Sequence, residues 1–211
     1  MDKKISKSVL KRLPGYLAYL KNMTDPDSPY ISATALANAL GMGEVQVRKD
    51  LATVSDGGRP KIGYLRESLI DDIEQFLGYD NTTDAILVGA GKLGQALMDH
   101  KGFDEYGLNI LAGFDVNPSA EHTEDGKPIY PIEKLEKFCR NHKVLMGIIT
   151  VPAAHAQEVC DRLIANGIKA IWNFAPIHLE VPGHILVQYE NMASSLAVLS
   201  MHLQAQMKDK K

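Results

Sequence analysis

The feature that most constrains the fold of this chain is a short apolar run that ends in three glycines at fixed spacing. Residues 86–94 read ILVGAGKLG, with glycines at positions 89, 91 and 94. A strand that passes through such a turn into a helix is typical of the phosphate-binding turn of dinucleotide folds. Gly89 allows the tight turn, Gly91 lets the backbone approach a pyrophosphate at the helix N-terminus, and Gly94 lets the helix pack on the strand.

The next predicted strand ends in an acidic residue at the spacing that a dinucleotide fold requires. Residues 109–116 read NILAGFDV, and Asp115 lies 21 residues after Gly94. A carboxylate at this position accepts hydrogen bonds from the ribose hydroxyls and repels an additional 2′-phosphate. We therefore expect NADH and NAD⁺ as the cofactor, rather than the NADP pair.

Three more strands and one helix are expected to complete a doubly wound parallel sheet. The strands lie near 144–152, 168–177 and 184–190, and the helix 153–166 ends at Gly167. Ligands of such sheets lie over the carboxyl ends of the strands. The expected cofactor-binding residues are Gly89, Ala90, Gly91, Lys92, Leu93, Gly94, Asp115, Val116, Thr150, Val151, Pro152, Asn173, Phe174 and Ala175.

The residues before this sheet predict four helices and a hairpin. The first helix, at 8–23, has a stripe of Val9, Leu13, Tyr16, Leu17 and Leu20, and Pro14 is expected near its start or at a bend. A second helix begins after the N-cap Ser32, with Leu36, Ala39 and Leu40 as its buried face. The run Gly41-Met42-Gly43 ends it, so a helix-turn-helix is predicted.

The third predicted helix is the one that would enter a DNA major groove. Its apolar residues are Val45, Val47, Leu51 and Val54, which leaves Gln46, Arg48 and Lys49 facing outward. Gln46 can read adenine, Arg48 can read guanine or hold a phosphate, and Lys49 suits a phosphate. The alternative is a structural helical hairpin with a polar outer face.

A wing and a fourth helix are expected to follow. Residues 55–68 read SDGGRPKIGYLRES, which predicts a small β-hairpin with Arg59 and Lys61 at its tip. The helix 69–77 ends at Gly78, and residues 78–84 form a linker. The expected domains are therefore a winged helix at 1–78, a Rossmann-like domain at 84–190 and a C-terminal helix at 191–208.

Charge is distributed unevenly along the chain. Residues 1–66 carry eleven Lys or Arg and six Asp or Glu, a net of +5, whereas the rest carries twelve and twenty, a net of −8. A basic N-terminal segment joined to an acidic remainder indicates that the N-terminal segment binds a polyanion. The alternative is that solvated surface charges cluster there by chance.

The composition indicates where in the cell the protein is expected and which kinds of site it is expected to lack. No apolar run approaches the ~20 residues of a membrane span, and the start MDKKISKSVLKRL is unlike a signal peptide. The two cysteines, Cys139 and Cys160, are not spaced as a metal or redox motif. We expect a cytoplasmic protein with no membrane contact and no metal site.

The last predicted helix, ENMASSLAVLSMHLQAQM, has a long apolar stripe. Its members are Met192, Leu196, Leu199, Leu203 and Met207. Such a stripe packs either on the chain's own core or on another subunit. We favour a subunit, because winged helices usually bind palindromic DNA as symmetric dimers.

Six short motifs occur together in this chain, namely Lys11-Arg12-Leu13-Pro14, Gln46-Val47-Arg48-Lys49-Asp50-Leu51, Gly63-Tyr64, Val88-Gly89-Ala90-Gly91-Lys92-Leu93-Gly94, Lys101-Gly102-Phe103 and Asn173-Phe174-Ala175-Pro176. The resemblance that they carry, over nearly all of the chain, is to the Rex family of redox-sensing transcriptional repressors. It implies an α/β chain with an N-terminal winged helix, a Rossmann-like NAD(H)-binding domain and C-terminal helices exchanged in a homodimer. It also implies repression of genes of fermentative and respiratory NAD regeneration, with release from a palindromic operator by NADH. Lys11, Arg12 and Tyr64 join the expected DNA-binding residues on this ground.

The chain departs from the family pattern in three places. The segment ATVSDGGRPKIGY stands where relatives commonly have SYFG and a KRGVGY-like wing. Ala18 and Asn191 stand where relatives often have Arg and Asp. If that pair helps to couple the nicotinamide state to the dimer angle in relatives, this chain must couple the two differently or respond less sharply.

Two alternatives come from other classes. A small NAD-dependent oxidoreductase would need a proton donor, for which His155 and His100 are candidates. A coenzyme A binder could use the same nucleotide fold, but Asp115 suits free ribose hydroxyls better than a 3′-phosphate. Under the repressor hypothesis no catalytic residue is expected.

Overall fold

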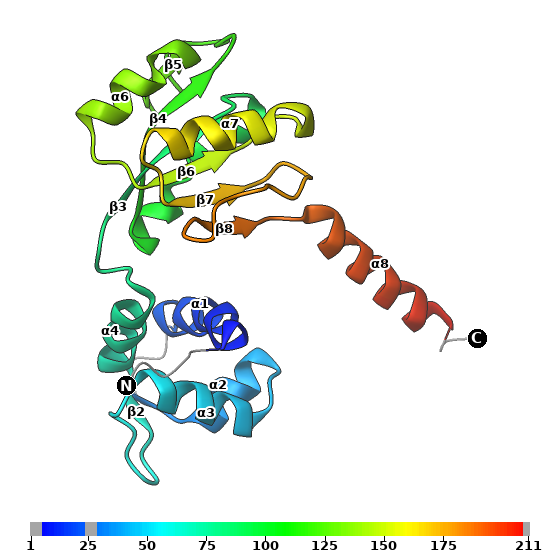
Figure 1. Cartoon of the computed structure of the whole chain (residues 1–211). Helices are drawn as coiled ribbons and strands as arrows, with labels where there is room; N and C mark the ends of the chain where they lie inside the picture. Colours follow the sequence, from blue (N-terminus) through cyan, green and yellow to red (C-terminus); the bar gives the residue numbers. More distant parts are fainter. Residues whose placement is uncertain (1–5, 24–28, 209–211) are drawn as a thin grey trace. The chain divides into compact units, whose positions relative to one another are not determined.

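The computed structural model describes residues 6–23 and 29–208 (Figure 1). The chain divides into two compact units, Met1–Asn81 and Thr82–Lys211, and each is described here by itself. Unit 1 is helical with one small hairpin, and unit 2 is built on a parallel sheet.

Unit 1 packs its helices around one apolar core. Its elements are α1 (Lys7–Lys21), β1 (Tyr30–Ile31), α2 (Ala33–Leu40), α3 (Glu44–Val54), β2 (Tyr64–Leu65) and α4 (Arg66–Leu77). The stripe of α1 is confirmed, because Leu13, Tyr16, Leu17 and Leu20 are buried. Pro14 lies in the middle of α1 and not at its start.

The helix-turn-helix is confirmed, with a different buried face on α2. The Ser32 hydroxyl accepts the backbone N–H of Ala35 at 3.0 Å, and Gly41 ends α2 in the left-handed conformation at φ 63°. Ala39, which was expected in the core, is exposed. Ala33 and Ala37 are buried instead, since with Leu36 they follow the helical i, i+3, i+4 spacing.

Helix α3 presents one apolar residue that the sequence pattern placed in the core. Val47 and Leu51 are buried as expected, but the side chain of Val45 is 64% exposed. Two residues along a helix correspond to about 200° of rotation, so Val45 lies opposite Val47. Asp50, in contrast, is buried with only 1% exposure.

The wing is a tight hairpin. The backbone N–H of Arg59 donates to the Gly63 carbonyl, and the Gly63 N–H donates to the Arg59 carbonyl, both at 2.9 Å. Lys61 at its tip has a positive φ of 66°. The strand that follows, β2, pairs antiparallel with β1, a partner that the sequence did not indicate. Helix α4 then ends at Gly78 in the left-handed conformation, as expected.

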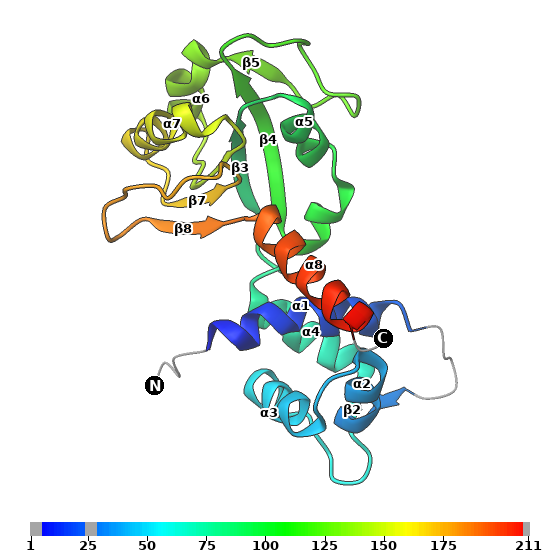
Figure 2. The same ribbon diagram turned by 90° about the vertical axis from the view of Figure 1, so that its right-hand side faces the viewer.

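Unit 2 contains a six-stranded parallel sheet with the order β5-β4-β3-β6-β7-β8. The strands are β3 (Thr83–Val88), β4 (Leu108–Asp115), β5 (Ile129–Pro131), β6 (Met146–Ile149), β7 (Ala170–Asn173) and β8 (Leu186–Tyr189). Helices α6 (Leu135–Asn141) and α7 (Ala153–Ala165) cover one face (Figure 1), and α5 (Lys92–Met98) covers the other (Figure 2). The order reverses beside β3, whose carboxyl end therefore lies at the switch point where such sheets bind ligands.

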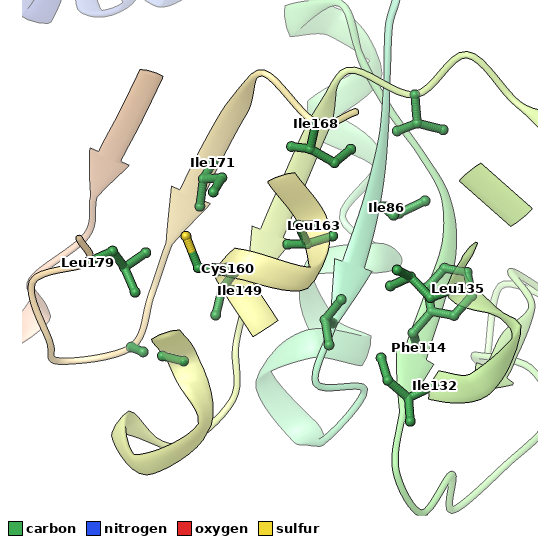
Figure 3. Packing of buried hydrophobic residues seen from close by; sticks show 14 of the residues in the cluster. Ile86, Phe114, Ile132, Leu135, Ile149, Cys160, Leu163, Ile168, Ile171 and Leu179 are labelled. Carbon is green, nitrogen blue, oxygen red and sulfur yellow. The ribbon is translucent and has the colours of Figure 1, made fainter. Parts of the chain in front are cut away.

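The larger core of unit 2 lies between the sheet and α6 and α7 (Figure 3). Ile86, Phe114 and Ile149 come from the strands, and Leu135 and Leu163 come from the two helices. The sequence did not predict β5 and α6, which are three and seven residues long. Two short 3-10 helices, Lys101–Tyr106 and Ile132–Lys134, complete the connections.

The last helix, α8 (Met192–Lys208), extends away from the sheet of unit 2 (Figure 1). Four residues of its expected stripe, Leu196, Leu199, Leu203 and Met207, are 57–65% exposed. The side chain of Met192 lies outside the described residues. Within 6–23 and 29–208, no helix has the length and apolar character needed to cross a bilayer.

Candidate functional site

The glycine turn between β3 and α5 depends on the absence of side chains. Gly89 has a φ of 105°, and a Cβ there would lie 2.8 Å from the Thr150 carbonyl carbon. A Cβ on Gly94 would overlap the Gly89 carbonyl oxygen. Both glycines are therefore required by the fold itself, which agrees with their expected roles in the tight turn and the helix packing.

Gly91 differs from its two neighbours. A Cβ there would meet no described atom within 4 Å, and its φ of −71° is open to any residue. Neither packing nor backbone conformation within the described chain accounts for a glycine at this position. The expected close approach of a pyrophosphate to Gly91 stays a prediction.

Side chains from two other segments hold the turn. The Thr150 hydroxyl donates to the Gly89 carbonyl at 2.7 Å, so the end of β6 is tied to the end of β3. The Gln95 amide donates to the Ala90 carbonyl at 2.7 Å and to the Ser119 hydroxyl at 3.3 Å. These bonds fix the backbone that the sequence assigns to the phosphates.

A cavity of about 270 Å³ opens beside the turn at the carboxyl ends of the strands. It brings together seven of the expected cofactor residues, namely Gly89, Gly91, Asp115, Val116, Thr150, Val151 and Pro152. One carboxylate oxygen of Asp115 accepts the backbone N–H of Asn117 at 2.9 Å, which orients the group. The cavity thus joins the glycine turn to the carboxylate expected to bind ribose.

Helix α7 contributes cavity residues that the sequence analysis did not include among the binding residues. His155, Glu158, Val159 and Arg162 line the cavity together with Ile132. The four helical positions share one face, beside the buried face of Ala156, Cys160 and Leu163. This i, i+3, i+4, i+7 spacing was available in the sequence, but only the packed sheet shows which face meets the cavity.

Arg162 forms one end of the cavity wall that α7 contributes. Its Nε donates to Glu136 at 2.6 Å, and its Nη2 donates to the Ile132 carbonyl at 3.1 Å. The hydrogen bond from Arg162 holds the pKa of the Glu136 carboxyl below its usual value. Arg162 therefore connects α6 to α7 and acts as a fixed part of the cavity wall.

The remaining expected cofactor residues are not part of the lining of this cavity. Lys92 and Leu93 are exposed at the start of α5, whereas Ala90 is buried. Asn173 is fully buried, and its amide nitrogen donates to the Ala175 and Ile177 carbonyls at 3.1 and 3.0 Å. Asn173 therefore shapes the turn that carries Phe174 and the buried Ala175.

The candidate DNA-contacting face of unit 1 is organised around the buried Asp50. Arg12 donates to this carboxylate through Nε at 2.7 Å and Nη2 at 2.9 Å. The Tyr16 hydroxyl and the Gln46 amide each donate to it at 2.8 Å. Arg12 and Gln46, both expected to contact DNA, are thus also partners of Asp50.

This network changes the pKa values of its members. Burial alone would raise the pKa of Asp50, but the hydrogen bonds from Arg12, Tyr16 and Gln46 outweigh it and lower that pKa. Burial and the hydrogen bond to Asp50 raise the pKa of Tyr16 to about 12. Asp50 is therefore a buried anion that joins α1 to the recognition helix α3.

The other expected DNA-contacting residues lie at the surface of unit 1, with one exception. Lys11, Lys49, Arg59 and Lys61 are exposed, and Arg48 forms an exposed ion pair with Glu44 on the same helix. Tyr64 is buried at 9% exposure. A Cβ on Gly58 would come within 2.8 Å of its ring, so Tyr64 supports the base of the wing.

Comparisons with known proteins agree with this arrangement. Residues 4–52 match a family model described as a putative DNA-binding protein N-terminus, and residues 80–177 match one described as a CoA binding domain. The redox-sensing transcriptional repressor Rex of Porphyromonas gingivalis is 40% identical over 200 residues, which are 94% of this chain and 92% of that protein. This chain belongs to the Rex family.

Another Rex, from Bacteroides fragilis, is 39% identical over 93% of this chain and 90% of its own length. Solved structures of the Rex-family repressor RSP match the whole chain. RSP in complex with β-NAD⁺ and operator DNA has a TM-score of 0.87 at 34% identity, covering 99% of this chain and 97% of RSP. RSP in complex with β-NADH has a TM-score of 0.85 at 33% identity and covers 99% of each chain. The Rex fold, a winged helix followed by a Rossmann-like domain, is therefore the fold of this chain.

Proposed function

We propose that this Rex-family protein binds operator DNA through its winged helix and is released from it by NADH. The observation that carries the proposal is Gly91, a glycine that the described chain does not need, placed at the mouth of a cavity that ends in Asp115. A dinucleotide needs both features, because its pyrophosphate approaches the backbone and its ribose hydroxyls bind a carboxylate.

The nucleotide is proposed to run across the carboxyl ends of the strands. Asp115 binds the adenosine ribose, and the turn from Gly89 to Gly94 holds the pyrophosphate, with Lys92 and Leu93 exposed beside it. Val116 and the α7 face around His155 enclose the adenosine. The nicotinamide then lies over β6 and β7, near Thr150 and Phe174.

Discrimination between NADH and NAD⁺ comes from the nicotinamide end. The two forms share the adenosine and phosphate contacts, and they differ by one positive charge and by ring planarity. A neutral reduced ring is better tolerated than a cationic ring in an apolar pocket near Phe174, because removing a charge from water costs more than removing a neutral ring. A ligand shifts a two-state protein only by its differential affinity, and a tenfold preference supplies about 1.4 kcal/mol.

The Asp50 network defines how Gln46 would read a base. Its amide has two N–H groups, and one of them bonds to Asp50. The other N–H and the carbonyl oxygen are then free to form the bidentate pair with adenine. We assign Arg12 to holding Asp50 rather than to a base.

The other DNA contacts follow from exposure and charge. Arg48 can exchange Glu44 for a guanine or a phosphate, and Lys49 suits a phosphate. Arg59 and Lys61 reach from the wing, and Lys11 lies exposed on α1.

Val45, which the sequence pattern did not select as a DNA contact, is an exposed apolar residue able to contact a thymine methyl group. We propose a cytoplasmic protein, because operator DNA is found in the cytoplasm.

Two copies are proposed to assemble through α8. Its exposed stripe has a counterpart on the sheet, since Leu186 of β8 is 72% exposed. A helix of 17 residues is about 25 Å long, long enough for the helix of one subunit to pack along β8 of the other. NADH would then act by changing the separation of two recognition helices, because half-site spacing is strict.

The test is titration of a protein–operator complex with nucleotide. The probe is a labelled palindromic duplex recovered by genomic footprinting of the bound protein, followed by fluorescence anisotropy. NADH should release the duplex at concentrations where NAD⁺ does not. Equal release by both nucleotides, or by neither, contradicts the proposal.

Coenzyme A is a second candidate ligand, favoured by the family model that matches residues 80–177. A thermal-shift series with NADH, NADPH and coenzyme A separates the candidates, because a ligand that binds only the folded state raises Tm. We expect the largest shift with NADH.

The oxidoreductase alternative is tested by steady turnover with small alcohols or hydroxy acids and by the effect of His155→Ala, since His155 lines the cavity.

A further inference from the structure

Trp172, the single tryptophan of the chain, stands between the nicotinamide end of the sheet and the last helix. Its ring centroid lies 4.8 Å from that of Phe174, and the two planes are tilted by 53°. On another side it meets Phe103 edge-on at 5.5 Å. Trp172 is therefore packed between two aromatic rings, and a displacement of Phe174 displaces its neighbour.

The polar edge of the same side chain reaches the segment that leads into α8. Its indole N–H donates to the Glu190 carboxylate at 3.0 Å. The backbone N–H of Glu190 donates to the Asn173 carbonyl at 2.9 Å, so this residue is held by both side chain and backbone. Glu190 is the last residue that is fixed to the sheet in this way.

Helix α8 begins almost at once after this anchor. Asn191 caps it, with its side-chain oxygen accepting the Ser194 N–H at 3.0 Å. No turn of chain separates Glu190 from the first residue of the helix at position 192. A change in the Glu190 position therefore changes the direction in which α8 leaves the sheet.

We propose that Trp172 is a positioning residue that couples the nicotinamide to α8 through its hydrogen bond to Glu190. The inference rests on the proposed function, because it takes Phe174 as the neighbour of the nicotinamide. The reduced and oxidised rings pack differently on Phe174, and Trp172 moves with Phe174. Because Glu190 is hydrogen-bonded to Trp172, it moves too and changes the direction of α8. The coupling requires the indole N–H and an acceptor at position 190, and the carboxylate charge is secondary.

The test compares operator affinity with and without saturating NADH for the full-length protein and its variants. Trp172→Phe keeps an aromatic ring and removes the indole N–H together with the five-membered ring that carries it. We expect NADH affinity and nucleotide-free operator affinity within about threefold of wild type. The weakening of operator binding by NADH, typically 5–150-fold for such coupled sites, should fall to about twofold or less.

Variants at Glu190 identify whether the coupling requires the charge or only the hydrogen-bond acceptor at this position. Glu190→Gln keeps an oxygen acceptor and should retain the NADH effect, whereas Glu190→Ala should lose it as Trp172→Phe does. Gln188→Ala is the matched control, because Gln188 also donates to Glu190 but at 3.4 Å from an exposed position. It should leave the NADH effect intact, and thermal unfolding with gel filtration checks that every variant folds and assembles as wild type does.

The outcomes separate this inference from the proposed function. A wild-type protein that NADH does not release from DNA contradicts the proposed function, whatever the variants do. A wild-type protein that responds, together with a Trp172→Phe variant that responds fully, overturns the Trp172 inference alone. Loss of response in Gln188→Ala or Glu190→Gln also overturns it.

Energy transfer from the single tryptophan to reduced nicotinamide gives an independent readout. Its absence in NADH-bound wild type would contradict the proximity on which the inference depends.

Discussion

The two candidate sites are built in opposite ways. The DNA-contacting face of unit 1 is organised by a buried carboxylate, because Asp50 accepts hydrogen bonds from Arg12, Tyr16 and Gln46. The nucleotide turn of unit 2 is organised by missing side chains, and two of its glycines leave no room for a Cβ. Removing atoms should therefore damage the first site, and adding atoms should damage the second.

The largest effect is expected from one added methyl group in the nucleotide turn. In Gly94→Ala the new carbon would overlap the Gly89 carbonyl oxygen, so α5 must move away from β3. Overpacking of this kind costs about 1–3 kcal/mol of unfolding free energy. We expect a lower Tm of unit 2 and loss of NADH binding by calorimetry, with operator affinity unchanged in the absence of nucleotide. A variant with wild-type Tm and NADH affinity would contradict the close approach of α5 to β3.

Removing the buried anion of unit 1 should change stability by a similar amount, but it should weaken rather than abolish ligand binding by that unit. Asp50→Ala leaves Arg12 and the Tyr16 hydroxyl without their acceptor, which should destabilise unit 1 by about 2–3 kcal/mol. Chemical denaturation measures the loss, and operator affinity should fall because Gln46 loses its orientation. The control is Asp50→Asn, which keeps one acceptor oxygen and should be less destabilising. Equal stability of the alanine variant and wild type would show that the network contributes nothing.

A sharper comparison comes from the glycine that has open space around it. In Gly91→Ala the new methyl group meets no described atom within 4 Å, so Tm should stay within about 2 °C of wild type. NADH affinity should nevertheless fall by roughly tenfold, about 1.4 kcal/mol, because the methyl group keeps the pyrophosphate from the backbone. Unchanged NADH affinity would show that the nucleotide does not approach Gly91.

The smallest expected effect is on the pH dependence of stability. The pKa of Asp50 is lowered in the folded state, so its contribution is fully present above the unfolded pKa of about 3.9. It is lost as the pH falls through the folded value, when the carboxyl becomes protonated. Denaturation of wild type and Asp50→Asn across acidic pH should therefore give stabilities that converge at low pH. A difference that stays constant down to the lowest pH would rule out Asp50 as the titrating group.

Features that depend on a few consecutive residues could be predicted from the sequence. The left-handed turns at Gly41 and Gly78, the Ser32 cap and the glycine turn all follow from local backbone chemistry. The same holds for the order of the longer strands and helices, whose apolar periodicity is unambiguous. The three-residue β5 was missed because so short a segment has no period.

The tertiary structure alone decided which of these residues meet. The exposure of Val45 and the burial of Asp50 depend on how α3 rotates against α1. Two of the three partners of Asp50 lie 34 and 38 positions away in the sequence. The cavity face of α7 depends on its register over the sheet. The bond from Trp172 to Glu190 depends on two adjacent strands. Sequence periodicity specifies which residues share a face, whereas the neighbour of that face is specified only when the elements pack.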